Sequence, residues 1–236
     1  MKTVIIAAGI GSRLWSHTDQ APKTLLPFGQ GTILSQIMSN FETIGVSEFV
    51  IVVGFGAKHI VEYIGATGLG PRVTFVENRD WQRGNGLSVH LAHGVAGAGS
   101  FLLSMSDHLV APSALAHLMA ARSDQNLLLV DRRVDDVFDL PDATKVMLEG
   151  TCITAIGKGL ADFNAVDCGV FRLDERFFES MECAIRQGKE SISEGVQHMI
   201  EARVFGGVLL PEGSRWIDID TPETYEYALA HRHWYV

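Results

Sequence analysis

Residues 4–14 read VIIAAGIGSRL, an apolar run that passes directly into a loop with two glycines and an arginine. An unbroken apolar run of this kind is typical of a parallel strand that is buried on both faces. Gly9 and Gly11 let the backbone approach a ligand closely, because they carry no Cβ atom and adopt positive φ at little cost. Their amide groups can then point at phosphate oxygens. The stretch therefore predicts a phosphate-binding loop after the first strand.

A lysine follows this loop in the segment PKTLLP, residues 22–27. Lys23 stands between Pro22 and Pro27, and the two prolines stiffen the backbone on either side of it. We expect Lys23 and Arg13 to supply the positive charge that holds a triphosphate. A solvated loop lysine is the alternative for Lys23, and the stiff backbone argues against it.

The composition excludes several classes of partner. The chain has 236 residues and a net charge of −9 at pH 7, a field that repels nucleic acid and anionic membranes. No apolar stretch reaches the ~18–20 residues of a membrane span. The isolated cysteines Cys152, Cys168 and Cys183 form no C-x-x-C pair, which favours a reducing cytoplasm over a disulfide framework. We therefore expect a cytoplasmic protein that binds neither nucleic acid nor membrane.

Strands and helices alternate through the first 130 residues. Apolar runs predict strands at residues 4–8, 49–53, 73–76, 101–105 and 127–130, with helices at 32–44, 57–64, 88–96 and 113–122 between them. This alternation indicates parallel crossovers and a doubly wound, Rossmann-like sheet. Ligands bind such sheets beyond the carboxyl ends of the strands. Because the Gly9–Arg13 loop and Asp107 both follow strands, we expect them to share one crevice.

The pattern changes after residue 131. Short strands at 145–148, 153–156 and 166–171 predict a small antiparallel extension or lid, and helices at 176–187 and 192–202 follow. Strands at 204–208 and 216–220 then precede a last helix that Thr221 caps. The predicted fold is a single α/β domain over residues 1–236, with a mostly parallel sheet. The change of pattern divides this domain into residues 1–130 and residues 131–236.

Three kinds of phosphate loop compete for residues 9–14. A Walker loop needs G-x-x-x-x-G-K-[ST], which the chain lacks. A dinucleotide fingerprint needs a third glycine where Leu14 stands, and an acid after the second strand where Gly54 stands. The remaining pattern, G-x-G-x-R-L followed by P-K, resembles the nucleotidyltransferases that activate sugars and small alcohols with a nucleoside triphosphate.

The resemblance extends over nearly the whole chain, to about residue 230. Four further segments fall where that family reads the base, binds the metal, meets the acceptor phosphate and binds the metal again: Gly84–Ser88, Ser106–His108, Ile156–Lys158 and Trp216–Thr221. Each motif alone is modest, whereas their order and spacing together make chance agreement improbable.

Within the family the chain is similar to the CTP:inositol-1-phosphate cytidylyltransferases. Further segments carry this likeness: Arg83–Gly86, Thr144–Val146 and Val166–Gly169. The resemblance implies that an acceptor phosphate attacks the α-phosphorus of CTP and that pyrophosphate leaves, with Mg²⁺ as cofactor. Some members carry a second, membrane-embedded synthase domain, which we do not find here, so we expect this chain to release its product. A homodimer is an open alternative to a monomer.

The resemblance also implies that residues 1–130 are the nucleotide-binding half and that residues 131–236 are the acceptor-binding half, which carries the second metal-ligand segment. It implies roles for individual residues as well. Arg13, Lys23 and Lys158 would be the catalytic cations. Asp107 and Asp218 would bind Mg²⁺, and Asp220 would either join them or hold the loop and cap the last helix. Lys145, Lys158 and Asp167 would bind the acceptor, although Lys145 could instead pair with Asp142, and Lys158 and Asp167 could merely shape turns. Nucleotide contacts are expected at Ala7, Ala8, Gly9, Gly11, Ser12, Arg13, Lys23, Gly84, Asn85, Gly86, Ser88, Ser106 and Asp107.

Other functions remain open at this point. The acceptor could be phosphocholine, an aminoalkylphosphonate or a sugar 1-phosphate. Proteins bind a quaternary amine in an aromatic cage. Candidate residues for such a cage are Trp15, Trp81, Phe163 and Trp216. A nucleotide-binding regulatory subunit without catalysis is the third hypothesis, and the presence of every expected charged residue weakens it.

Overall fold

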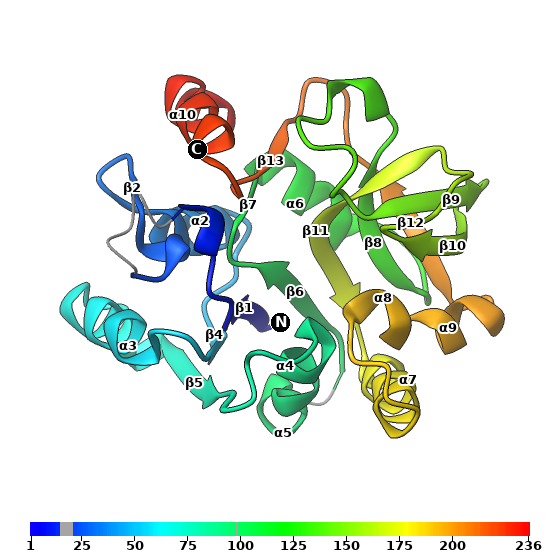
Figure 1. Ribbon diagram of the computed structural model, residues 1–236, viewed down its shortest axis with the longest axis horizontal. Helices are drawn as coiled ribbons and strands as arrows, with labels where there is room; N and C mark the ends of the chain where they lie inside the picture. The colour runs from blue at the N-terminus through cyan, green and yellow to red at the C-terminus, as the bar shows by residue number, and fades with distance from the viewer. Residues whose placement is uncertain (15–20, 98) are drawn as a thin grey trace.

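The first half of the molecule alternates strands and helices, as its apolar runs predict (Figure 1). The computed structural model describes residues 1–14, 21–97 and 99–236. The elements in this half are β1 (Thr3–Ala7), α2 (Ile33–Thr43), β4 (Phe49–Val53), α3 (Ala57–Ala66), β5 (Val73–Glu77), α4 (Asn85–Leu91), α5 (His93–Ala96) and β6 (Phe101–Met105).

Two helix boundaries differ from the sequence-based expectation. The helix expected at residues 57–64 continues through Gly65 to Ala66. The helix expected at residues 88–96 begins at Asn85 and is interrupted at Ala92, where α4 ends and α5 begins. α2 begins after Thr32, which forms a capping box with Ser35, and Gly45 follows the helix with φ of 88°.

The second half contributes shorter elements. They are β7 (His108–Val110), α6 (Pro112–Ala120), β8 (Asn126–Asp131), β9 (Lys145–Glu149), β10 (Cys152–Gly157), β11 (Ala165–Leu173), α7 (Glu175–Arg186), α8 (Ile192–Gly195), α9 (Gln197–Glu201), β12 (Phe205–Leu209), β13 (Trp216–Asp218) and α10 (Pro222–Ala230). The helix expected at 192–202 is thus two short helices, and the strand expected at 216–220 ends at Asp218.

Within the described residues, nine strands form one mixed sheet in the order β5-β4-β1-β6-β11-β8-β12-β10-β9. The strands β5, β4, β1 and β6 are parallel, as expected. β11 is antiparallel to its neighbours β6 and β8 and lies inside the sheet, and β9 pairs with both β10 and β11. The α/β class is therefore confirmed, and the antiparallel part is larger than a small extension at the edge.

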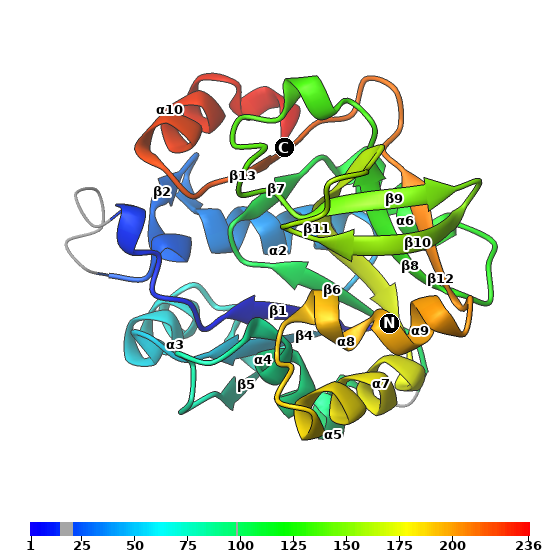
Figure 2. The ribbon, with the colours of Figure 1, turned by 45° about the vertical axis from the view of Figure 1, so that its right-hand side comes forward.

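Alternating side chains of the strands build an apolar core on each face of the sheet. Ile5 and Ala7 of β1 belong to the cluster that includes residues of α2, α3, α6 and α10. Val4 and Ile6 belong to the cluster on the other face, with residues of α4, α5, α7, α8 and α9. In Figure 2, α5 and α7 lie below the sheet and α10 lies at the top. Both faces are covered, which explains the uninterrupted apolar run of β1.

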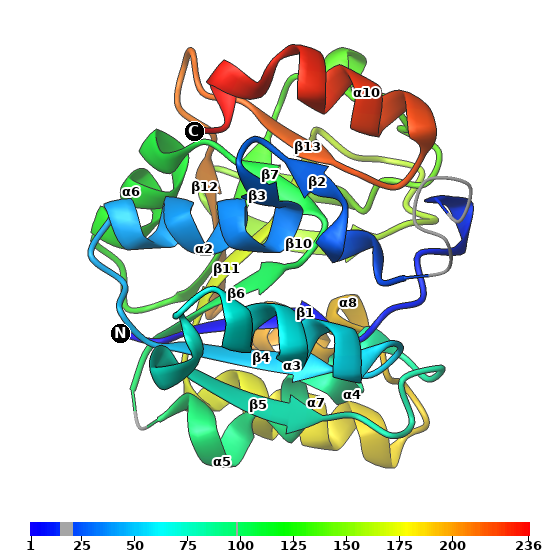
Figure 3. The same ribbon diagram turned by 90° about the vertical axis from the view of Figure 1, so that its left-hand side faces the viewer.

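The end of the chain packs beside its beginning (Figure 3). β13 pairs with β7, and α10 follows it across the hairpin of β2 (Pro27–Phe28) and β3 (Gly31–Thr32). The hydroxyl group of Tyr225 donates a hydrogen bond of 2.6 Å to the carbonyl of Pro27. This packing brings the last strand of the chain to the carboxyl end of β6.

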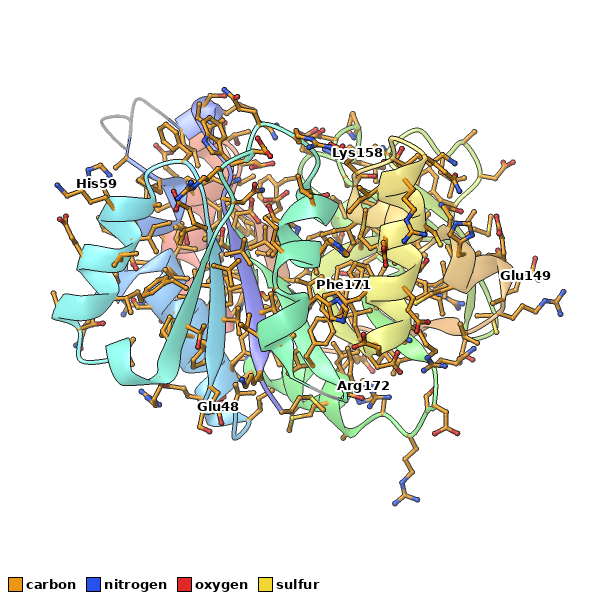
Figure 4. All side chains as sticks on the ribbon, turned by 90° about the horizontal axis from the view of Figure 1, so that it is seen from below. Glu48, His59, Glu149, Lys158, Phe171 and Arg172 are labelled. Carbon is orange, nitrogen blue, oxygen red and sulfur yellow. The ribbon has the colours of Figure 1, made fainter. Side chains whose placement is uncertain are left out.

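The two edges of the sheet carry different groups. In Figure 4, Lys158 lies at the upper edge, whereas Glu48, which precedes β4, lies at the lower edge. The upper edge is the side at which the parallel strands end. No helix among the described residues combines the length and apolarity that a membrane crossing requires.

Candidate functional site

Asp107 and Asp218, far apart in the sequence, meet at the carboxyl end of β6. Asp107 follows that strand directly, and the pairing of β7 with β13 places Asp218 opposite His108. The backbone amide of Ile219 donates to the carbonyl of Asp107 at 2.9 Å. One ligand atom from each of Asp107, His108 and Asp218 lies within 4.8 Å of the others. The two carboxylates therefore share one cleft, as the sequence predicts.

Opposite charges surround Asp107. Its Oδ2 lies 2.6 Å from Lys23 Nζ, and its Oδ1 accepts a hydrogen bond of 2.7 Å from His108 Nδ1. Burial favours the neutral acid, but the Lys23 charge and the His108 hydrogen bond outweigh it and hold the pKa of Asp107 well below its usual range. Burial also opposes the charge on Lys23, and the neighbouring carboxylates nevertheless raise the pKa of that ammonium. Both groups are charged at neutral pH.

Asp218 has the opposite environment. Burial, with the nearby charges of Asp107 and Asp220, raises the pKa of Asp218 to about 7 against the influence of His108. Burial disfavours a charge on His108, but Asp218 and Asp107 raise the pKa of its imidazole to about 9. The His108 Nδ1 atom lies 3.7 Å from Asp218 Oδ1. Burial thus favours the neutral form of Asp218, and a cation bound beside it would favour the carboxylate.

These residues fit a divalent metal ion. Among the described residues, the buried Oδ1 atom of Asp218 has no hydrogen-bond partner. Asp107 and Asp218 offer the carboxylate oxygens that Mg²⁺ prefers, and one ring nitrogen of His108 lies among them.

Asp220 is engaged differently from Asp107 and Asp218. Its carboxylate forms ion pairs with both Lys23 and Arg13, the latter at 2.6 Å from Nη2. Its backbone amide donates to Thr224 Oγ1, beside the Thr221 cap of α10. This geometry favours the loop-holding alternative for Asp220, and its role as a metal ligand stays a prediction.

The glycine loop and the lysine segment are packed together. Gly11 has φ of 59°, and a Cβ atom there would lie 2.8 Å from the side-chain stem of Lys23. A Cβ at Gly9, in contrast, would meet nothing within 4 Å. Thr24 Oγ1 donates to the carbonyl of Ser106 at 3.0 Å, which ties the lysine segment to the strand end beside Asp107. The absence of a Cβ atom at Gly11 thus makes room for the Lys23 side chain, which extends to Asp107. The space beside Gly9 is open.

Arg13, at the end of the loop, contacts three carboxylates. Its guanidinium lies 2.8 Å from Asp142, 2.6 Å from Asp220 and 3.5 Å from Asp139. Ser12 is exposed beside it in η1 (Ser12–Leu14). Arg13 therefore joins the loop to the segment between β8 and β9.

The expected base-reading segment is fixed by contacts within the protein. A Cβ at Gly84 or Gly86 would lie 2.3 Å or 2.6 Å from the carbonyl oxygen of Glu190. The Gly86 amide donates to that carbonyl at 2.7 Å, and the Ser88 hydroxyl is buried against Asn78. These glycines are needed for packing, whatever ligand they also meet. Asn85 differs, because it lines the cavity described next.

A cavity of about 600 Å³ adjoins the carboxylate cluster. Asp107, Asp218, Lys158 and Asp167 all line it, so two of the three expected acceptor residues reach it. Burial raises the pKa of Asp167 to about 6, although the Gly169 amide donates to its carboxylate at 2.6 Å. The cavity has the size of a small-molecule site.

Lys145 is the expected acceptor residue that the structure places elsewhere. It is buried, and its ammonium donates to the carbonyls of Pro141 and Lys158 at 2.7 and 2.9 Å. It therefore supports the backbone on both sides of the acceptor turn. Its alternative partner, Asp142, contacts Arg13 and Lys158 instead.

Sequence reasoning missed a chain of contacts that orients His108. The buried Asp131 accepts two hydrogen bonds from the Arg133 guanidinium and one of 3.0 Å from the Trp216 indole. Trp216 stacks on the His108 ring with centroids 5.8 Å apart. Residues 131–142 are rich in aspartate, but no spacing rule in the sequence links Asp131 to Trp216.

Of the described aromatic residues proposed for a cage around a quaternary amine, one lines the cavity. Trp216 lines the cavity, whereas Trp81 packs against Phe55 and Phe163 is not among the lining residues. Trp15 lies outside the described residues. The sequence did not single out Phe138, Tyr227 and Trp234, which also line the cavity.

The chain matches one family model and known proteins along most of its length. The model of the MobA-like NTP transferase domain matches residues 3–148. A protein of Thermococcus kodakarensis named bifunctional IPC transferase and DIPP synthase is 31% identical over 230 residues, which cover 96% of this chain and 49% of that protein. The chain thus spans about half the length of this curated relative.

A second curated protein matches a shorter part of this chain, and a solved structure matches nearly all of it. The CMP-5'-(3-aminopropyl)phosphonate synthase of Streptomyces rubellomurinus is 31% identical over 170 residues, covering 61% of this chain and 27% of that protein. The solved structure of the inositol-1-phosphate CTP transferase from T. maritima superposes with a TM-score of 0.86 at 27% identity, covering 97% of this chain and 94% of that one.

Proposed function

We propose that this chain, which belongs to the MobA-like NTP transferase family, transfers a cytidylyl group from CTP to inositol 1-phosphate and releases pyrophosphate. The observation that carries the proposal is the meeting of Lys23, Asp107 and Asp218 at the edge of a cavity that Lys158 also lines. The names of the Thermococcus kodakarensis relative and of the T. maritima structure support CTP and the inositol phosphate acceptor.

The chemistry requires cations more than it requires a base. The acceptor is a phosphomonoester that is already anionic at neutral pH, so its oxygen attacks the α-phosphorus of CTP without losing a proton. The bond from the α-phosphorus to the bridging oxygen breaks, and pyrophosphate leaves with the electron pair. Arg13 and Lys23 would hold the triphosphate and stabilise the leaving group, while Lys158 would hold the attacking phosphate. These charges offset the repulsion between two anionic substrates.

Asp107 and Asp218 would hold Mg²⁺, because their oxygens converge and Asp218 Oδ1 accepts no hydrogen bond from the described residues. When bound, the ion supplies positive charge to phosphate oxygens. Asp131 and Trp216 would keep His108 against Asp107, so that the carboxylates stay in place when substrates enter. Gly169 is required there, since a Cβ atom on it would lie 2.3 Å from the His108 ring.

The cavity offers polar groups to a polyol. Asp167 and Thr144 line it, with Ser193 on the opposite segment. Carboxylate and hydroxyl oxygens accept hydrogen bonds from the hydroxyl groups of an inositol ring. This set of donors and acceptors supports inositol 1-phosphate as the acceptor.

An acceptor with an ammonium group is the second candidate. Asp136 and Asp139 line the cavity beside Phe138, whose ring packs on Tyr227 with centroids 4.5 Å apart. Acidic and aromatic groups together favour an organic cation. The name of the Streptomyces rubellomurinus relative also supports an aminoalkylphosphonate.

A pyrophosphate-release assay tests both candidates. It crosses the four nucleoside triphosphates with inositol 1-phosphate, phosphocholine, 2-aminoethylphosphonate and glucose 1-phosphate, with and without Mg²⁺. We expect release with CTP, inositol 1-phosphate and Mg²⁺. Strong release with an amine acceptor and none with inositol 1-phosphate would replace the acceptor, and no release in any combination would favour the regulatory subunit.

We also place the protein in a reducing cytoplasm, which its free thiols support: Cys152, Cys168 and Cys183 form no disulfide among the described residues. Thiol titration of the protein from a cell extract should find these cysteines reduced. The homodimer and the lack of nucleic-acid binding stay predictions.

A further inference from the structure

One carboxylate, that of Asp142, is held by cations from both substrate sites. Arg13 Nη2 lies 2.8 Å from its Oδ2 atom, and Lys158 Nζ lies 2.7 Å from its Oδ1 atom. Arg13 comes from the loop after β1, and Lys158 follows β10. A single group with two anionic oxygens therefore spans the gap between the loop expected to hold the nucleotide and the turn expected to hold the acceptor.

An acceptor phosphate needs the same position. It must contact Lys158 and also approach the α-phosphate, whose charge Arg13 would help to hold. Carboxylates and phosphates accept hydrogen bonds from Arg and Lys in closely similar geometry. The two oxygens of Asp142 thus mark where two oxygens of a phosphate would lie.

We propose that Asp142 occupies the seat of the acceptor phosphate in the substrate-free protein and leaves it when that phosphate binds. Asp142 is in this sense an internal competitor that mimics the substrate. The inference rests on the proposed function, because it takes Arg13 and Lys158 as the phosphate-binding cations.

The strength of these contacts suits a group that must be displaced. The side chains of Arg13, Asp142 and Lys158 are 47%, 37% and 62% exposed. Ion pairs at such exposure contribute little to stability, because water and salt screen them. A phosphate dianion carries more charge than a carboxylate and can replace it, whereas a singly charged small anion gains little over it. Asp142 therefore keeps the two cations neutralised while it disfavours weak anions.

Asp142 can leave without unfolding its segment. The preceding carbonyl, of Pro141, accepts from the buried Lys145 ammonium, and the Asp142 amide donates to the carbonyl of Asp139 at 3.1 Å. These contacts hold the backbone on which the side chain turns. Rotation of the Asp142 side chain then frees Lys158 and removes one of the three carboxylates that contact Arg13.

The test uses inorganic phosphate as the probe, titrated into the full chain by calorimetry without nucleotide. Asp142→Asn removes the charge and keeps the size of the side chain. Asp135→Asn is the matched control, since it makes the same charge change on an exposed residue of the same segment that does not line the cavity. We expect Asp142→Asn to lower the phosphate Kd about fivefold to tenfold, the equivalent of losing two weak ion pairs. Asp135→Asn should change the Kd by less than about twofold.

The double variant Asp142→Asn with Lys158→Ala shows where the gain arises. It should lose the added affinity, because the seat then lacks one of its two cations. Equal phosphate affinity in the wild type and Asp142→Asn would overturn the inference, as would a gain that persists in the double variant. Circular dichroism and thermal unfolding of each variant confirm that the compared proteins are folded.

These outcomes are separate from those of the proposed function. One outcome is that Asp142→Asn binds phosphate more tightly while no CMP is transferred to inositol 1-phosphate. That result would support the position assigned to Asp142 and contradict the acceptor assignment. If CMP transfer proceeds and phosphate affinity does not respond to Asp142→Asn, the function stands and the inference fails.

Discussion

Lys23 and Asp107 form an ion pair of 2.6 Å that joins the loop segment after β1 to the end of β6. The side chains are only 12% and 17% exposed, so each group depends on the other for its charged state. The residue expected to hold a triphosphate is thus kept in place by the residue expected to hold the metal. Substrate binding has to exchange part of this contact for contacts with phosphate oxygens.

Replacing Lys23 by methionine should reduce kcat/KM for CTP roughly 10²–10³-fold, because a well-placed cation is lost from the transition state. The change also leaves the buried Asp107 charge without its nearest cation, so the protein should be less stable. Steady-state kinetics and urea unfolding measure the two effects. The exposed Lys58 offers a control, and activity of Lys23→Met equal to that of Lys58→Met would contradict the assignment.

The two loop glycines should respond differently to alanine. Gly11→Ala places a Cβ atom at positive φ and against the Lys23 stem, which should cost about 1–2 kcal/mol of stability. Gly9→Ala meets no neighbouring atom, so its melting temperature should match the wild type. If nucleotide approaches Gly9, that variant should nevertheless bind CTP more weakly. Thermal unfolding and CTP calorimetry separate the cases, and equal stability losses would contradict the packing argument.

Asp218→Asn should weaken divalent-ion binding about tenfold or more, because it removes one of two converging carboxylates. Calorimetric titration with Mn²⁺ measures the affinity without any need for turnover. Asp220→Asn is the comparison that decides between the two roles left open for that residue. Its Mn²⁺ affinity should stay within about twofold, because the Asp220 carboxylate faces Lys23 and Arg13. An equal loss in both variants would make Asp220 a ligand.

Asp167→Asn should make the protein more stable at neutral pH and impair acceptor binding. Burial raises the pKa of Asp167 from 3.8 to about 6, so the folded state binds the proton more tightly than the unfolded state does. Wild-type stability should therefore fall as pH rises from about 4 to about 6, by at most about 3 kcal/mol. The advantage of Asn should be absent below pH 4 and complete above pH 6, as urea unfolding across that range would show. A constant difference at all pH values would exclude the titration.

Local sequence signals predicted the parallel half of the fold well. Each predicted strand of the first 130 residues exists. β1 and β4 are buried throughout, so a continuous apolar run marks them, whereas β5 lies at the edge of the sheet and is only partly buried. The place of β11 inside the sheet was not predictable, since its sequence reports burial and not the direction of its partners. The resemblance to nucleotidyltransferases, which rested on the order of several short motifs, is confirmed by the family match and the structural neighbour.

The site was predictable where one residue type follows one strand, as at Asp107. It was not predictable where contacts join distant segments. Asp142 and Asp131 lie in an acidic stretch whose pairing with Arg13 and Trp216 depends on how residues 132–144 cross the cavity. Gly84 and Gly86 show the converse, because a glycine pattern expected to meet a base also serves to pack against Glu190.

The pairing of β13 with β7 has a consequence for the ribosome-bound chain. Asp107 is synthesised 111 residues before its neighbour Asp218. A partly translated molecule can form the first parallel strands and still lack one side of the carboxylate pair. The carboxylate pair is therefore complete only after β13 has been synthesised and has paired with β7.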